Sequence, residues 1–219
     1  MNVIKTIWGT LLDFILPESG KVQNLLRFEP GEMRLLLPQS PARIPNLNVL
    51  FDYQNRQVKN LVKAIKYKNN YSLRKRVAGY LYEEMMSLAE DITLFDGAPP
   101  IIVPMPMSKL EKRKRSFNQC EELVREIEKL SNNGLEVGYD ILQKIRETKR
   151  QTELNKEERL ENVKNSMRIS PEFENSSKIQ NRVVIVIDDV YTTLASFREA
   201  ERALLAAGAK RVLGIFIAH

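Results

Sequence analysis

The feature that most constrains this chain is an unbroken run of five β-branched residues, Val183 to Ile187. The run has no polar alternation, which is typical of a strand covered on both faces, as in a parallel α/β sheet. Two acids, Asp188 and Asp189, follow directly, and then a short turn rich in hydroxyl groups. Apolar residues at helical spacing come next, and Gly208 is placed to end that helix. The stretch therefore predicts a strand, an acidic turn and a helix.

A strand, acidic turn and helix of this kind suit a sugar phosphate. In an open α/β sheet, ligands bind beyond the carboxyl ends of the strands, and the backbone N–H groups at a helix N-terminus hold phosphate. The carboxylates of Asp188 and Asp189 can accept hydrogen bonds from a diol. Hydroxyl groups for the phosphate come from Thr192, Thr193 and Ser196. The alternative is a polar turn that only ends a buried strand, and the hydroxyls and the following helix favour the sugar phosphate.

The composition disfavours several other chemistries. The single cysteine, Cys120, excludes a disulfide framework and a cysteine zinc site, and it suits a reducing cytosol. The only histidine is His219, so a Ser-His-Asp triad, a Cys-His pair or a histidine metal site is disfavoured. Neither a Walker motif nor a GxGxxG motif is present. With 43% hydrophobic and 28% charged residues, the chain is expected to be a soluble globular protein.

The first 50 residues are expected to form an appendage. Lys5 and Asp13 interrupt an apolar stretch that is too short to span a membrane, so an amphipathic helix ending at Pro17 is favoured over an anchor. Several prolines follow, and they predict irregular chain with a short strand at Met33 to Leu37. We therefore expect an appendage over residues 1–50 and an α/β domain over residues 51–219.

Shorter signals predict the other elements of the α/β domain. Aliphatic strands are expected at Ile101 to Val103, Tyr139 to Ile145 and Val212 to Ile217. Apolar residues at helical spacing predict helices from Leu73 to about Ala89 and from Phe117 to Leu130. The expected fold class is α/β, with a parallel sheet flanked by helices.

A strongly basic segment precedes these elements. Between Tyr53 and Tyr82 there are eight basic residues and no acid. A helix over residues 56–66 would place one apolar face inward and a basic side outward. That basic side carries Arg56, Lys59, Lys63 and Lys66. Clustered bases neutralise phosphates and the interleaved tyrosines can stack on unpaired bases, which makes single-stranded DNA a candidate ligand. A solvated helix face, with the tyrosines in the core, explains the same pattern equally well.

The stretch from Val184 to Ser196 resembles the phosphoribosyl pyrophosphate (PRPP) signature of type I phosphoribosyltransferases. That signature has four aliphatic residues, two acids, a spacer, Thr or Ser, Gly, any residue and Thr. Here Leu194 stands in the Gly position and Ser196 in the last Thr position. The resemblance implies that Asp188 and Asp189 clamp the ribose, and that Mg²⁺ arrives with PRPP. It also implies a phosphate seat formed by Thr192, Thr193, Leu194, Ala195 and Ser196.

Three further segments resemble the ComF-type competence family, cytosolic phosphoribosyltransferase-like proteins of bacterial DNA uptake. They are Ile65 to Tyr71 (IKYKNNY), Val103 to Gln119 (VPMPMSKLEKRKRSFNQ) and the charged excursion from Arg146 to Val163. Ser116 and Asn69 stand where that family usually has Gly. The resemblance implies that Arg113, Lys114 and Arg115 face pyrophosphate, and that Arg146, Thr148 and Gln151 belong to a lid. The family's N-terminal zinc cysteines are missing here, so no zinc is expected.

Two functions follow from these patterns. In the first, the protein binds PRPP or a related sugar phosphate with Mg²⁺ and acts in DNA uptake; the family's reaction would make it a glycosyltransferase. No general base or acceptor can be named, and Leu194 in the phosphate loop leaves catalysis open. In the second, the protein is a non-catalytic cytosolic accessory that binds single-stranded DNA, with other DNA-uptake proteins as partners. No dedicated protein metal site is expected in either case.

Overall fold

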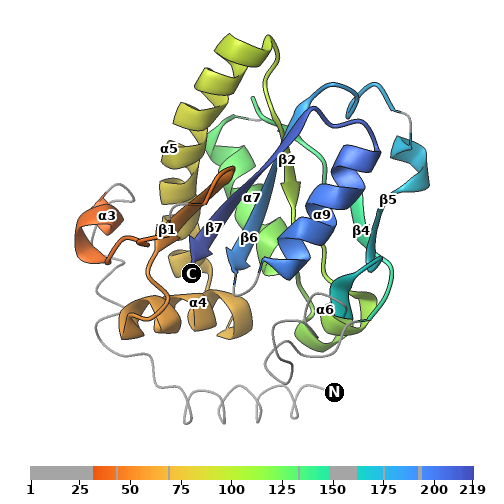
Figure 1. Ribbon diagram of the computed structural model, residues 1–219. Coiled ribbons are helices and arrows are strands. Elements are labelled where there is room, and N and C mark those ends of the chain that lie inside the picture. The colour runs from red at the N-terminus through yellow and green to blue at the C-terminus, as the bar shows by residue number, and fades with distance from the viewer. Residues whose placement is uncertain are drawn as a thin grey trace.

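The computed structural model describes residues 32–42, 44–68, 70–132, 134–147, 162–174, 176–191 and 194–219. Within them, five parallel strands form one sheet in the order β1-β7-β6-β2-β3 (Figure 1). The strands are β1 Leu47–Phe51, β2 Ile101–Pro104, β3 Glu136–Val137, β6 Val183–Val190 and β7 Arg211–Ala218. The strands expected around Ile101, Val183 and Val212 thus lie in one parallel sheet, as predicted.

Strand β6 is the middle strand of this sheet. Its Ile185 pairs with Ile102 of β2 on one side and with Leu213 of β7 on the other. Side chains along β6 enter two apolar cores in turn: Ile185 and Ile187 lie in one core, whereas Val184 and Val186 lie in the other. Both faces of the strand are therefore covered, which explains why the sequence run has no polar alternation.

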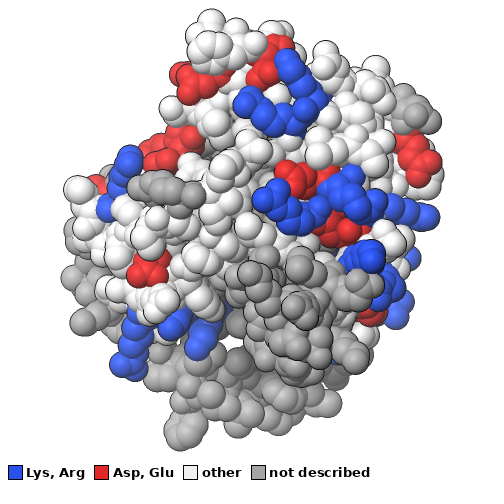
Figure 2. Space-filling model, viewed as in Figure 1, with Lys and Arg blue, Asp and Glu red and all other residues white. Residues whose placement is uncertain are grey.

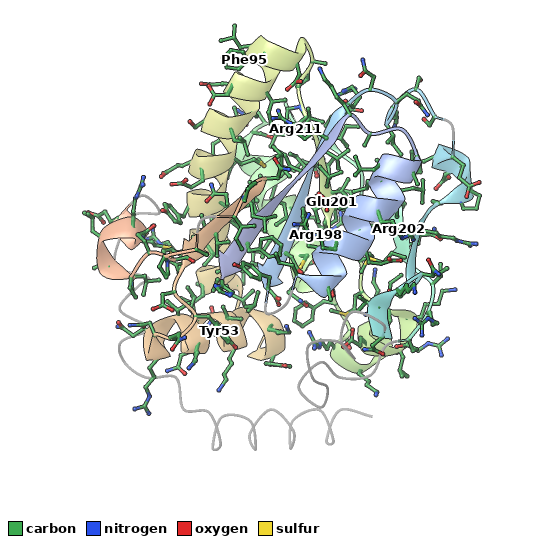
Figure 3. All side chains as sticks on the ribbon, viewed as in Figure 1. Tyr53, Phe95, Arg198, Glu201, Arg202 and Arg211 are labelled. Atoms are coloured by element: carbon green, nitrogen blue, oxygen red, sulfur yellow. The ribbon has the colours of Figure 1, made fainter. Side chains whose placement is uncertain are left out.

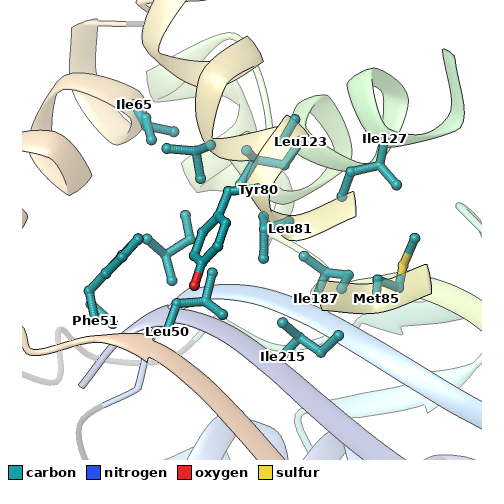
Figure 4. Packing of buried hydrophobic residues seen from close by; sticks show 14 of the residues in the cluster. Leu50, Phe51, Ile65, Tyr80, Leu81, Met85, Leu123, Ile127, Ile187 and Ile215 are labelled. Carbon is teal, nitrogen blue, oxygen red and sulfur yellow. The ribbon is translucent and has the colours of Figure 1, made fainter. Parts of the chain in front are cut away.

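Three helices cover one face of the sheet. Side chains of α5 and α7, including Tyr80 and Leu123, pack against Ile187 and Ile215 of the central strands (Figure 4). The helices are α4 Arg56–Lys68, α5 Tyr71–Asp96 and α7 Gln119–Leu130. These are the helices that the apolar periodicity predicted, although α5 continues to the left-handed Gly97.

Helix α9, Ala195–Ala206, and a small antiparallel sheet cover the other face. Phe197 of α9 meets Phe216 of β7 edge-on, with ring centroids 5.8 Å apart. The small sheet pairs β4 Leu142–Lys144 with β5 Met167–Ile169. Gly208 has φ +93° and its N–H donates to the Leu205 carbonyl, so it ends the α9 segment as predicted.

Two local expectations need correction. The strand expected at Met33 to Leu37 is wrong: Met33–Leu36 forms helix α3, because Met33 and Leu37 are both buried and lie one helical turn apart. The strand expected from Tyr139 to Ile145 is reduced to β4, which pairs outside the main sheet. The expected division between residues 50 and 51 stays a prediction; both residues lie in β1, which pairs with β7. The basic run Lys109–Arg115 forms helix α6, and Pro171–Phe173 forms a 3₁₀ turn, η4.

No helix in the described part of the chain is both long and apolar enough to cross a lipid bilayer.

Candidate functional site

The candidate site lies at the carboxyl end of β6. Strands β6 and β7 point toward the side of the molecule where α4 lies, and α6 lies on that side as well (Figure 1). Asp188 and Asp189 are the sixth and seventh residues of β6; Asp188 is half-buried and Asp189 is buried. Because ligands of parallel α/β sheets bind at this edge, the acid pair is in the expected place.

Asp189 is buried, and hydrogen-bond donors surround its carboxylate. Its side chain is 5% exposed. The Lys66 ammonium lies 3.1 Å from Oδ2 and 3.3 Å from Oδ1. Gln119 Nε2 donates to Oδ2 at 2.8 Å, and the Val190 backbone N–H donates to Oδ1 at 2.7 Å. Residues from β6, α4 and α7 therefore meet at one carboxylate.

The contacts of Lys66 and Gln119 extend to α6. Gln119 accepts a hydrogen bond of 3.4 Å from the Arg115 guanidinium. That guanidinium also lies 5.0 Å from the ring centroid of Tyr67, the neighbour of Lys66 on α4. Burial lowers the pKa of Lys66, but the charges of Asp189 and Asp188 outweigh burial, and the pKa is raised overall. The Lys66 ammonium therefore stays protonated.

Asp188 has a different environment from Asp189. Its Oδ1 accepts the Asp189 backbone N–H at 2.8 Å and the Cys120 thiol at 3.4 Å. Burial and the charge of Asp189 raise the pKa of Asp188 to about 7. Burial and the same two acids raise the pKa of Cys120 well above its ordinary value, so this thiol stays protonated and donates. The pair thus combines one carboxylate that has a single cationic partner among the residues that the structure describes, Lys66, with one carboxyl group whose pKa lies near neutrality.

The turn after β6 has the backbone conformation that the sequence pattern reserves for glycine. Leu194 is left-handed, with φ 60° and ψ 2°, and it directly precedes α9. Its carbonyl accepts the Arg198 N–H at 2.8 Å, which starts the helix. Ala195 is buried and Ser196 is half-buried in the first turn of α9. Thr192 and Thr193 lie outside the described residues.

Ser116, like Leu194, is a left-handed residue at a position where the family pattern has glycine. Ser116 has φ 69° at the end of α6. The Asn118 side chain then accepts the Cys120 N–H at 3.0 Å and donates to the Met105 carbonyl at 3.0 Å. This buried amide starts α7 and ties it to the chain after β2. It thereby places Gln119 and Cys120 beside the two acids.

The cations expected at pyrophosphate all lie on α6, but they differ in exposure. Arg113 and Lys114 are exposed, whereas Arg115 is half-buried and pairs with Glu111 at 3.8 Å. The Ser108 hydroxyl donates to the Glu147 carboxylate at 2.6 Å, and the Leu110 N–H donates to it at 3.1 Å. The Ser108 hydrogen bond lowers the pKa of Glu147. Glu147 therefore fixes the start of α6.

The expected lid is described only at its base. The Arg146 guanidinium donates to the Asn162 carbonyl at 3.1 Å and to the Lys164 carbonyl at 2.7 Å. It therefore joins the two ends of the charged excursion. Thr148 and Gln151 lie outside the described residues.

The four bases expected to form a nucleic-acid face do not share one environment. Arg56 is exposed, and Lys59 lies 5.9 Å from the ring centroid of Tyr53. Lys63 is half-buried and Lys66 pairs with Asp189. Lys66 lies one turn after the buried Val62, at the border of the apolar face of α4. This spacing is the sequence signal that could have indicated that the Lys66 side chain points toward the protein interior.

Gln119 and Cys120 are site residues to which sequence reasoning gave no role. Both lie in the first turn of α7 and contact the acid pair. The sequence signal for Gln119 was its place at the end of the ComF-like segment Val103 to Gln119, whereas Cys120 fitted the apolar face of the helix.

A five-stranded parallel sheet that is flanked by helices and carries two acids on its middle strand is an α/β phosphoribosyltransferase-like fold. No family model matches the chain. The chain is 31% identical to Competence protein ComFC of Streptococcus pneumoniae over 163 residues, which are 74% of this chain and 63% of that protein. It is 23% identical to Competence protein F of Haemophilus influenzae over 153 residues, which are 69% of this chain and 63% of that protein. These two relatives support the ComF-type family for this chain. It spans less than two thirds of the length of both relatives.

Proposed function

We propose that this protein binds PRPP or a related sugar phosphate, as its magnesium complex, in a cytosolic role linked to DNA uptake. The observation that carries the proposal is the placement of Asp188 and Asp189 at the carboxyl end of the middle strand, directly before a left-handed turn and the N-terminus of α9. The competence names of the two relatives support the link to DNA uptake.

Each part of such a ligand has a counterpart in the site. The carboxylates of Asp188 and Asp189 would accept the ribose hydroxyls. The first N–H groups of α9, with the Ser196 hydroxyl, would hold the 5′-phosphate, because amides at a helix N-terminus favour an anion. The exposed Arg113 and Lys114 on α6 would face the pyrophosphate and its Mg²⁺.

Titration calorimetry with PRPP and Mg²⁺ tests the proposal. The natural protein should bind, and the double variant Asp188→Asn, Asp189→Asn should bind roughly 100-fold more weakly, since hydrogen bonds to charged groups contribute about 1.5–3 kcal/mol each. Asp91→Asn is the matched control, because Asp91 is an exposed acid on α5. Absence of heat with the natural protein, or equal affinities of the protein and the double variant, would overturn the proposal.

A second candidate function is binding of single-stranded DNA on α4. Lys and Arg side chains gather over α4 at the lower left of the view, whereas over α9 they are interleaved with acids (Figure 2). Arg198, Glu201 and Arg202 lie along α9 (Figure 3), and Arg198 pairs with Glu201 at 2.6 Å. Within the described residues, none of Arg56, Lys59 and Lys63 forms an ion pair with an acid. Because these bases have no acidic partners in the described part of the chain, α4 is better suited than the mixed surface of α9 to bind a polyanion such as single-stranded DNA.

Fluorescence anisotropy with a labelled single-stranded oligonucleotide, measured over a salt series, tests this candidate. The variant Arg56→Glu, Lys63→Glu should bind more weakly whatever the base sequence. It should also have a shallower salt dependence, because each lost phosphate contact removes about 0.7 from the slope. Arg198→Glu is the control, since this arginine lies in the mixed surface of α9. Unchanged affinity of the α4 variant at low salt would rule the candidate out.

A further inference from the structure

Three hydrogen-bond donors, one of them the Lys66 ammonium, surround the carboxylate of Asp189. A carboxylate accepts about four hydrogen bonds, two on each oxygen. Oδ1 receives the Val190 N–H at 2.7 Å and the Lys66 ammonium at 3.3 Å. Oδ2 receives Gln119 at 2.8 Å, and the same ammonium lies 3.1 Å from Oδ2 as an ion pair. Because the Lys66 ammonium lies within 3.3 Å of both oxygens, a ribose whose hydroxyls use both oxygens of Asp189 must displace a donor.

Lys66 is the donor that is able to leave. The Val190 N–H belongs to the backbone of β6, which is fixed in the sheet by its neighbours. Gln119 is buried, and its amide oxygen is held by Arg115. The Lys66 side chain is 26% exposed and ends a flexible stem of four carbons, so its ammonium reaches other groups without movement of α4.

We propose that Lys66 is the ligand-displaceable counter-ion of Asp189, and that its ammonium moves to the pyrophosphate of the bound ligand when the ribose hydroxyls take its place. This inference rests on the proposed function. Before binding, Lys66 pairs with Asp189 and orients its carboxylate beside Asp188. After binding, the ribose hydroxyls occupy Asp189, and the half-buried ammonium needs another anion as its partner.

The surroundings of Lys66 indicate where the displaced ammonium goes. Its neighbour Tyr67 lies under the Arg115 guanidinium, with 5.0 Å from the guanidinium carbon to the ring centroid. Lys66 is therefore on the side of the acid pair that faces α6, where Arg113 and Lys114 are exposed. The 5′-phosphate seat is at α9, which packs on the opposite face of the sheet. The anion that Lys66 meets is thus the pyrophosphate, and the site selects ribose ligands that carry both a diol and a pyrophosphate.

Calorimetry with two ligands tests the exchange, because ribose 5-phosphate has the diol and the 5′-phosphate but lacks the pyrophosphate. Lys66→Met keeps most of the apolar stem and removes the ammonium. It should bind magnesium PRPP about 10- to 100-fold more weakly, the value of one charge-assisted hydrogen bond. The same variant should bind ribose 5-phosphate more tightly than the natural protein, because no cation competes for Asp189. Lys66→Arg should recover part of the PRPP affinity.

The controls separate the exchange from other effects. Lys75→Met removes an exposed positive charge on α5 and should change neither affinity. The variant Lys66→Met, Asp189→Asn keeps the charge balance of the site, so its melting temperature shows whether loss of the pair alone unfolds the protein. Equal weakening of both ligands by Lys66→Met would mean that Lys66 has only a structural role and would overturn the inference. An unchanged PRPP affinity, or ribose 5-phosphate binding that does not tighten, would also overturn it. Absence of PRPP binding by the natural protein would instead overturn the proposed function itself.

Discussion

Leu194 holds a backbone conformation that costs free energy for any residue with a Cβ. Its φ of 60° and ψ of 2° match the left-handed region, where a non-glycine residue costs about 1–2 kcal/mol. The departure of the sequence from the PRPP signature at this position could be read directly from the sequence. The conformation there required the structure, because the spacing of motif residues does not give dihedral angles.

Leu194→Gly should tighten the binding of magnesium PRPP. Glycine adopts the left-handed turn without strain, and it lets the backbone N–H groups before α9 approach a phosphate more closely. Calorimetric titration of the variant and the natural protein measures the change. Unchanged or weaker affinity would mean that the turn has adapted to leucine or does not hold phosphate.

Asp188 should make the protein less stable as the pH rises from about 4 to about 7. Its pKa is raised to about 7 in the folded state by burial and by Asp189, whereas an unfolded Asp titrates near 3.9. Between these values the folded state binds a proton that the unfolded state has lost, so the free energy of unfolding falls with rising pH. Asp188→Asn should lose this part of the slope. Urea unfolding between pH 4.5 and pH 7.5 measures it, and identical slopes for the two proteins would contradict the assignment.

Elements were predicted where local pattern and tertiary burial agree. Strand β6 has apolar residues that fill both cores, so its sequence alone indicated a central strand. Strand β3 has two residues and carries no periodicity. Strand β1 was not predicted: it lies just after the proline-rich stretch, where the sequence indicated irregular chain and a domain boundary. Helix α6 was read only as a basic run, because exposed helices without an apolar face give no periodic signal.

The contacts between elements are the part of the site that the sequence did not provide. The acid pair was predicted because its residues are adjacent and follow a buried strand. Lys66 and Asp189 are 123 residues apart in the chain, and their pairing exists only because α4 packs across the end of β6. Periodicity grouped Lys66 with the solvent-facing bases, since a residue at the border of an apolar face can turn either way.

At the end of α6, Ser116→Gly should stabilise the protein. Ser116 is left-handed, with φ 69°, and its N–H donates to the Lys112 carbonyl at 2.8 Å. Glycine at this position removes a steric cost of about 1 kcal/mol and keeps the hydrogen bond. Chemical denaturation measures the gain. Ser131→Gly is the matched control, because Ser131 follows α7 with φ −82° and gains nothing from glycine. A gain at both positions, or at neither, would contradict this explanation.

On the scale of the whole molecule, two regions of positive charge have different surroundings. On α4, Arg56 is exposed and Lys59 and Lys63 are half-buried without an acidic partner among the described residues, whereas Lys66 and Arg115 are turned toward the acid pair and its neighbours. The net charge of +6 therefore does not by itself indicate nucleic-acid binding, since part of it serves the candidate ligand site. A sugar-phosphate site and a DNA-binding face can coexist on this fold because they use different side chains.

A crystal structure of the protein with magnesium PRPP tests the central claim most directly. The account predicts the ribose hydroxyls at the carboxylates of Asp188 and Asp189, the 5′-phosphate at the N-terminus of α9, and the pyrophosphate toward α6. It also predicts the Lys66 ammonium at the pyrophosphate, away from the 3.1 Å contact that it makes with Asp189 in the ligand-free protein. A ligand bound on the outer side of α4, or away from the carboxyl end of β6, would contradict the account.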